Sequence, residues 1–85
     1  MTFTVYWWPA AETPLLASLL RAADKPALFA VVRDIDRRLR TNPTTEGESR
    51  DVDSRLLFVR PFCVFYSIDL DARAVNIELL RWVGT

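Results

Sequence analysis

The sequence predicts an α+β fold in which a two-helix hairpin packs on one face of a mostly antiparallel four-stranded sheet. A strand-like segment opens the chain, two helical segments follow, and three strand-like segments complete it. The reversals among the last three segments are short, so these strands are expected to be antiparallel neighbours. A helical hairpin on one face of such a sheet is the simplest way to bury both sets of apolar side chains.

A proline separates the N-terminal strand from the first helix. Residues 2–8 alternate and are rich in threonine, valine and aromatic side chains, and Pro9 ends this strand. Thr13 and Pro14 have the pattern of an N-cap followed by the first helical position, which predicts a helix that begins there. A start near Pro9 is the alternative.

A capping residue and an apolar stripe predict the second helix. Asp24 offers the cap, and Leu28, Val32, Ile35 and Leu39 follow at helical spacing on one face. The opposite face carries aspartates four residues before arginines, an arrangement that stabilises a helix by about 0.2 to 0.5 kcal/mol per pair, so this face is expected to be solvated. The pairs are Asp34 with Arg38 and Asp36 with Arg40.

A polar loop and three strands are predicted after the second helix. Residues 41–54 are almost free of apolar side chains and contain a proline and a glycine, which predicts a long surface loop. The strands are expected over Arg55 to Arg60, Phe62 to Asp69 and Arg73 to Val83, with Pro61 at the first reversal. The expected core residues are Leu28, Val32, Ile35, Leu39, Val64, Tyr66, Ile68, Val75, Ile77 and Leu79.

Length and composition fit one small domain over residues 1–85. Hydrophobic residues make up 51% of the chain, more than so small a domain can fully bury, so part of this excess is expected to face a partner. The 11 basic and 11 acidic side chains cancel, and the pI of about 6.2 argues against a general nucleic-acid binder. The single cysteine excludes an intramolecular disulfide, no signal peptide or membrane span is recognisable, and a cytoplasmic location is expected.

Short pieces of sequence spread over nearly the whole chain occur in a characteristic order. They are Trp8-Pro9, Glu12, residues 35–43, residues 47–50, Arg55, residues 61–68 and residues 75–77. In this order they resemble the RelE/ParE superfamily of toxins from type II toxin-antitoxin systems. The resemblance implies a β-α-α-β-β-β fold and, in the ribonuclease branch, cleavage of messenger RNA on the ribosome.

The residues that ribonuclease chemistry needs are incomplete in this sequence. Cations must hold the phosphate and a further group must take the 2′-hydroxyl proton. The catalytic candidates that the resemblance implies are Arg55, Arg60, Arg81 and Tyr66, with Arg50 and Glu48 nearby in sequence. Cys63 stands where that branch commonly carries arginine, the chain has no histidine, and no tail after Thr85 is expected to supply another tyrosine or lysine. Ordinary pairing of Arg50 and Arg55 with loop carboxylates is the structural alternative.

The sequence therefore favours a toxin-like protein that acts through protein contacts, with no cofactor and no metal. Clustered aspartates, including Asp69 and Asp71, are explained by helix pairing and turn chemistry, and Cys63 is expected to be a small buried hydrophobe. The expected partner is a small antitoxin; gyrase, the ribosome and a second copy of the chain are further alternatives, and plasmid stabilisation is the expected role. A non-toxic orphan domain and an active endoribonuclease remain as alternatives. The candidate partner-binding residues are Trp7, Trp8, Arg50 and Trp82.

Overall fold

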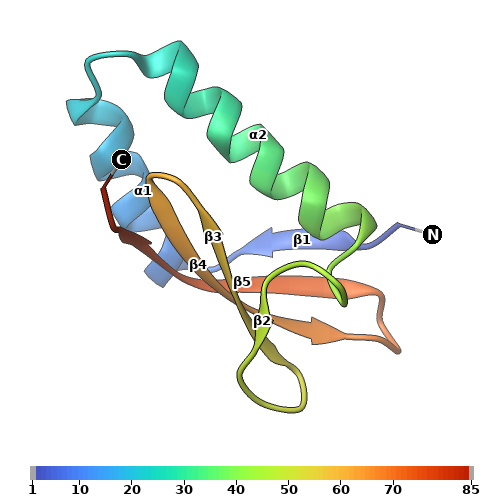
Figure 1. Cartoon of the computed structure of the whole chain (residues 1–85). Coiled ribbons are helices and arrows are strands. Elements are labelled where there is room, and N and C mark those ends of the chain that lie inside the picture. Colours follow the sequence, from blue (N-terminus) through green and yellow to red (C-terminus); the bar gives the residue numbers. More distant parts are fainter. Residues whose placement is uncertain (1, 85) are drawn as a thin grey trace.

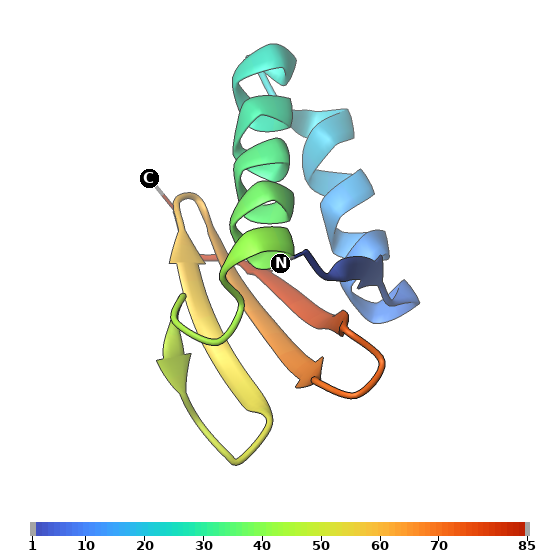
Figure 2. The same cartoon turned by 90° about the vertical axis from the view of Figure 1, so that its right-hand side faces the viewer.

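Two α-helices lie over one face of a mixed sheet (Figure 1), and a view turned by 90° separates the two layers (Figure 2). The computed structural model describes residues 2–84. The elements are β1 (Thr4–Trp7), α1 (Pro9–Arg21), α2 (Lys25–Thr41), β2 (Glu48–Ser49), β3 (Ser54–Val59), β4 (Phe62–Asp69) and β5 (Ala74–Trp82). The strand order is β1-β5-β4-β3-β2; β1 runs parallel to β5, and the other neighbours are antiparallel.

The predicted fold class is confirmed, and the sheet has one strand more than expected. The three C-terminal strands form the predicted meander, since β3, β4 and β5 are adjacent in the sheet. The fifth strand, β2, lies in the segment predicted to be loop, where Glu48 pairs with Leu56 and Ser49 with Arg55. Two exposed polar residues show no apolar alternation, so nothing in the sequence marks them as a strand.

Helix α1 begins at Pro9, so the prediction of a start at Thr13 was wrong and the alternative start is the observed one. Proline suits the first helical position because its missing N–H would have no partner there. The carbonyl oxygen of Trp8 accepts hydrogen bonds from the backbone of Ala11 and Glu12, both at 2.9 Å, and so begins the helix.

Helix α2 begins where the sequence predicts. The side chain of Asp24 accepts a hydrogen bond of 3.0 Å from the backbone N–H of Ala27. The expected charged face is present, because Asp34 pairs with Arg38 at 3.7 Å and further arginine–aspartate pairs lie beside it. Among residues 2–84, no helix is long and apolar enough to cross a membrane.

The core lies between the helices and the sheet. Of the residues predicted for it, those buried in the central cluster are Leu28, Ile35, Leu39, Val64, Tyr66, Val75 and Ile77, with Val32 and Ile68 partly buried against it. The prediction that Leu79 belongs to the core was wrong, because this side chain is half-buried and lies outside the cluster. Leu80, which is 2% exposed, occupies the core position instead. A register shift explains this, because Tyr66 pairs with Ile77 while its neighbour Phe65 pairs with Leu79. The extra β5 residue reverses the alternation that the sequence suggests.

Candidate functional site

The sheet has two faces with different surroundings. Side chains of Val64 and Tyr66 point toward the helices and join the core. Residues directly opposite one another in antiparallel strands share a face, so Phe58, Cys63 and Arg81, which pair across β3, β4 and β5, form a row on the other side. We call this second side the outer face.

Two of the four candidate catalytic residues hold the loop between α2 and β3. The Tyr66 hydroxyl lies 2.8 Å from the carbonyl oxygen of Pro43 and 2.7 Å from that of Glu46, and its single hydrogen is shared between these two acceptors. The Arg55 guanidinium donates to the carbonyl oxygens of Glu46 and Gly47, at 2.7 and 3.0 Å. We call these contacts the loop clasp. Arg55 therefore orders the loop, as the structural alternative expected, but through backbone carbonyl oxygens in place of the expected carboxylates. The role of Tyr66 in holding the loop was not predicted from the sequence.

The electrostatics of the loop clasp favour a neutral Tyr66. Its side chain is 1% exposed, and burial raises the pKa of the Tyr66 hydroxyl above the ordinary value of 10.0, an effect that the positive charge of Arg55 partly opposes. The hydroxyl is therefore protonated at neutral pH and acts as a hydrogen-bond donor. A phenol in this state is poorly suited to take a proton from a substrate.

The other two catalytic candidates lie elsewhere. Arg60 is exposed in the turn between β3 and β4, and Arg81 is exposed on the outer face, opposite Cys63. Arg55 and Arg60 stand at opposite ends of β3, about 17 Å apart at 3.3 Å per residue. The structure thus brings Arg55 and Tyr66 together, since they pair across β3 and β4, but it leaves Arg60 and Arg81 at other places and does not gather all four candidates at one point.

Cys63 is buried, as expected, but its surroundings are more cationic than the sequence suggested. It is 5% exposed, and strand pairing brings Arg81 opposite it. Burial raises the pKa of the Cys63 thiol above its ordinary value of 9.0, and the charges of Arg81 and Arg50 act in the opposite direction without reversing this. Arg50 itself pairs with Glu48 at 3.2 Å, which is the pairing expected for a loop-ordering residue. Cross-strand register, which a single sequence leaves open, is what places Arg81 there.

The candidate partner-binding tryptophans differ in exposure. Trp7 packs partly buried against the core, whereas Trp8 is 45% exposed and donates from Nε1 to Oδ1 of Asn76 at 3.2 Å. This agrees with the alternation of adjacent strand residues. Trp82 is 56% exposed, and its ring meets that of Phe62 edge to face with centroids 5.7 Å apart. Trp82 is therefore a held but accessible aromatic side chain.

An apolar groove runs beside Trp82 where the helical hairpin turns. It has a volume of about 300 Å³ and is lined by Ala22, Ala27, Leu28, Val31, Pro61 and Trp82. A second hollow, of about 400 Å³, shares Ala22 and Trp82 and is also lined by Ser18 and Arg21. We call the two together the hairpin-tip groove. Trp82 was predicted from the sequence as a candidate, but the alanines were not, because their role depends on how the helical hairpin meets the β3–β4 turn.

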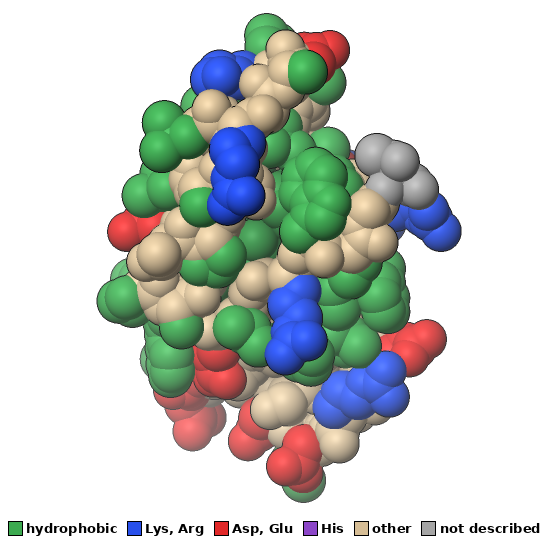
Figure 3. Space-filling view, turned by 90° about the vertical axis from the view of Figure 1, so that its left-hand side faces the viewer, with side chains coloured by type: hydrophobic (Ala, Val, Ile, Leu, Met, Phe, Trp, Pro, Cys, Tyr) green, Lys and Arg blue, Asp and Glu red, His purple; other side chains and the backbone are tan. Residues whose placement is uncertain are grey.

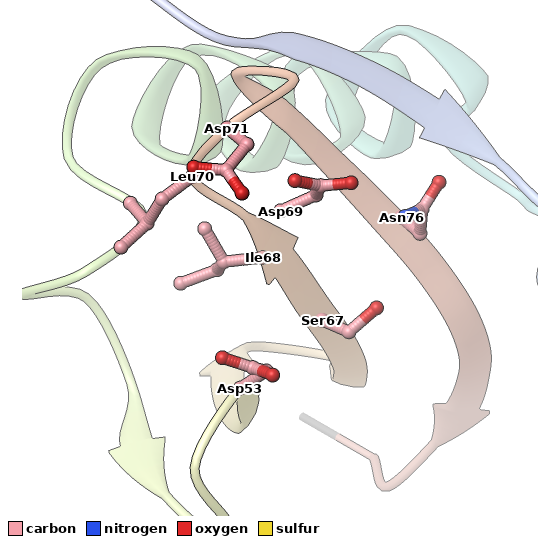
Figure 4. Close-up of a pocket in the computed structure, with 7 residues that line it drawn as sticks. All are labelled: Asp53, Ser67, Ile68, Asp69, Leu70, Asp71 and Asn76. Carbon is pink, nitrogen blue, oxygen red and sulfur yellow. The ribbon is translucent and has the colours of Figure 1, made fainter.

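The opposite end of the sheet carries an acidic hollow (Figure 4). Asp53 comes from the loop before β3, Asp69 is the last residue of β4, and Asp71 lies in the turn between β4 and β5. The Asp69 carboxylate accepts a hydrogen bond of 3.0 Å from the backbone N–H of Ala72, which is the turn chemistry expected for it. Within residues 2–84, no group of three or more metal-ligating side chains is close enough to hold a metal ion.

Comparison with solved structures identifies the fold. A chain of the toxin-antitoxin complex RelBE2 from Mycobacterium tuberculosis superposes with a TM-score of 0.74 and 19% identity, over 96% of this chain and 92% of that one. A chain of the chromosomal ParDE toxin-antitoxin system from P. aeruginosa superposes with a TM-score of 0.66 and 16% identity, over 98% of both chains. A chain of the archaeal RelE-RelB complex from Pyrococcus horikoshii OT3 superposes with a TM-score of 0.62 and 22% identity, over 99% of this chain and 98% of that one. No protein-family model matches the sequence, and no curated protein matches it.

Proposed function

We propose that this chain, which has the divergent RelE/ParE-like fold, is the toxin-like component of a toxin-antitoxin pair and acts through contacts with other proteins. The observation that carries the proposal is the dispersal of the catalytic candidates. Arg55 and Tyr66 hold a loop, while Arg60 and Arg81 stand alone at other places on the sheet. Cleavage of a phosphate ester needs several such groups around one phosphate.

The features that favour protein contacts lie away from the loop between α2 and β3 that Arg55 and Tyr66 hold. Trp82 and Trp8 are exposed aromatic side chains, each held by a specific contact, and held aromatic side chains are common interface anchors. The zero net charge also suits a protein partner better than the ribosome's RNA. The proposed partner is a small antitoxin in the cytoplasm, and a ParE-like action on gyrase would require no catalytic residue.

The test is induced expression with and without the open reading frame adjacent to the gene. Growth, messenger RNA integrity and plasmid supercoiling are followed in parallel. The control is Ile35→Asp, which places a carboxylate at a fully buried position and is expected to unfold the chain. Growth arrest that the adjacent product relieves, with intact messenger RNA, supports the proposal. Normal growth with no co-purifying partner contradicts it and favours the orphan-domain alternative. Codon-position cuts in messenger RNA contradict it in favour of the endoribonuclease.

A further inference from the structure

We infer that two copies of this chain associate through their outer faces, with the two sheets packed face to face around a two-fold axis that runs along β4. The inference goes beyond the proposed function and does not depend on it, because it concerns a contact of the chain with itself. It assigns an occupant to the side of the sheet that the two helices leave uncovered (Figure 2).

The centre of the outer face is apolar. Three large apolar side chains pair in a row across β3, β4 and β5, namely Leu56, Phe65 and Leu79. Phe58, which lies beside this row on the same face, is 55% exposed, and Phe65 and Leu79 are partly exposed. All four lie outside the core cluster between the sheet and the helices. An exposed aromatic ring next to other accessible apolar side chains is a favourable centre for a protein contact.

Charged side chains of both signs border this apolar centre on two sides. On β5, Arg81 lies on the outer face, and Glu78 accepts a hydrogen bond of 2.6 Å from the Ser67 hydroxyl on the same face. On the other side, Glu48 of β2 pairs with Arg50 at 3.2 Å. Below the helical hairpin, the surface in Figure 3 shows Lys and Arg near Asp and Glu, with hydrophobic side chains between them. Each side of the outer face thus carries one cation and one anion.

This distribution of charge makes the outer face complementary to itself. Because β4 is the middle strand of the five, a two-fold axis along it lays β3 of one copy over β5 of the other and β2 over the edge formed by β1 and β5. Arg81 then faces the exposed ring of Phe58 of the second copy, which favours a cation–π contact. Packed sheets lie about 10 Å apart, a gap that an arginine and a glutamate bridge together, so Glu48 of the second copy is also within reach of Arg81.

The charges of the chain as a whole favour a second copy over a partner of one sign. The 11 basic and 11 acidic side chains cancel, so two copies do not repel each other at long range. Within residues 2–84, Arg81 forms no ion pair, so a carboxylate of the second copy meets a cation that is free to pair. A uniformly acidic or basic partner would be attracted by half of the border and repelled by the other half.

Sedimentation velocity of the purified full chain, at increasing concentration, tests the inference. Arg81→Glu and Glu48→Arg each reverse one member of the proposed pair between copies, and Phe58→Gln removes the ring from an exposed position where a polar side chain is compatible with folding. Arg33→Glu is the matched control, because it makes the same change of charge at an exposed position of α2, in the helical layer. Circular dichroism establishes that each variant is folded.

We expect a concentration-dependent dimer for the wild type and for Arg33→Glu, and dissociation at least tenfold easier for each of the three outer-face variants. An equimolar mixture of Arg81→Glu and Glu48→Arg should recover the dimer, because the two reversed charges meet each other and the native pair is kept at the second contact. A wild-type chain that stays monomeric, outer-face variants that associate as the wild type does, or a mixture that does not recover would overturn the inference. Equal loss in Arg33→Glu would also overturn it, since the effect would then follow net charge and not the outer face.

Discussion

The two ends of the sheet use arginine in opposite ways. At the loop end, Arg55 donates to two carbonyl oxygens, and Arg38 and Arg50 pair with Glu46 and Glu48. At the hairpin-tip end, Arg21 and Arg60 lie beside apolar surface and, among residues 2–84, form no ion pair. The difference follows from the backbone: a long loop leaves carbonyl groups without strand or helix partners, and arginine side chains satisfy them. An arginine count alone therefore does not identify a catalytic centre.

The largest expected effect comes from the core that supports both ends. Replacing Ile35 by Ala should lower the free energy of unfolding by about 2 to 5 kcal/mol, since Ile35 is a fully buried residue of α2 and the change leaves a cavity in the core. Leu20→Ala is the matched control, because that leucine is 79% exposed. Urea denaturation followed by circular dichroism measures both. Equal stability of the two variants would mean that the apolar stripe of α2 does not face the sheet.

The next effect should be confined to the loop end. Gly47 has φ of +67°, and a Cβ there would lie 2.5 Å from the carbonyl oxygen of Leu56. Gly47→Ala should therefore lower the free energy of unfolding by about 1 to 3 kcal/mol through backbone strain. Gly84→Ala controls for the positive φ without the close contact, since nothing lies within 4 Å of its Cβ position. Thermal unfolding of the two variants at one pH gives the comparison. A Gly47 variant as stable as wild type would contradict the close β2–β3 approach.

Arginine substitutions compare the two ends directly. Arg55→Gln removes donors from two carbonyl oxygens and should lower the free energy of unfolding by about 1 to 3 kcal/mol. Arg60→Gln should change it by less than about 0.5 kcal/mol, because that side chain is exposed in a turn. Parallel denaturant titrations measure the difference. If both variants lose the same stability, the contrast between a structural and a free arginine does not hold.

The smallest effect is a pH dependence in alkaline solution. The folded-state pKa of Tyr66 is raised by burial, so the unfolded chain ionises this group first, from about pH 10 upward. The stabilisation is thus complete below pH 10 and is lost as the pH rises toward the raised folded value. Tyr66→Phe should flatten this part of the stability curve while lowering stability at neutral pH, where its hydrogen bonds to Pro43 and Glu46 are missing. If the stability of Tyr66→Phe falls with pH above 10 as steeply as that of the wild type, the Tyr66 hydroxyl is not shielded from solvent in the folded chain.

The fold was largely predictable because helical and strand periodicities mark α2, β3 and β4 clearly. The misses have local causes. The start of α1 depended on which of two prolines takes the first helical position, and β2 is too short and polar to show a pattern. The bulge in β5 turns Leu80 toward the core in place of Leu79. The candidate site was less predictable. The roles of Arg55 and Tyr66 depend on backbone carbonyls that approach only after folding, and the groove depends on contact between α1, α2 and the β3–β4 turn.

The most direct test of the account is the incubation of the purified chain with translating ribosomes, followed by mapping of messenger RNA ends. Because the catalytic candidates do not meet around one point, we expect no ends above those in a reaction that contains the unfolded variant Ile35→Asp. Cleavage at codon positions that is abolished by Arg55→Ala or Arg81→Ala, in variants shown to be folded, would contradict the account. It would mean that arginines assigned here to loop structure and surface form a working catalytic set on the ribosome.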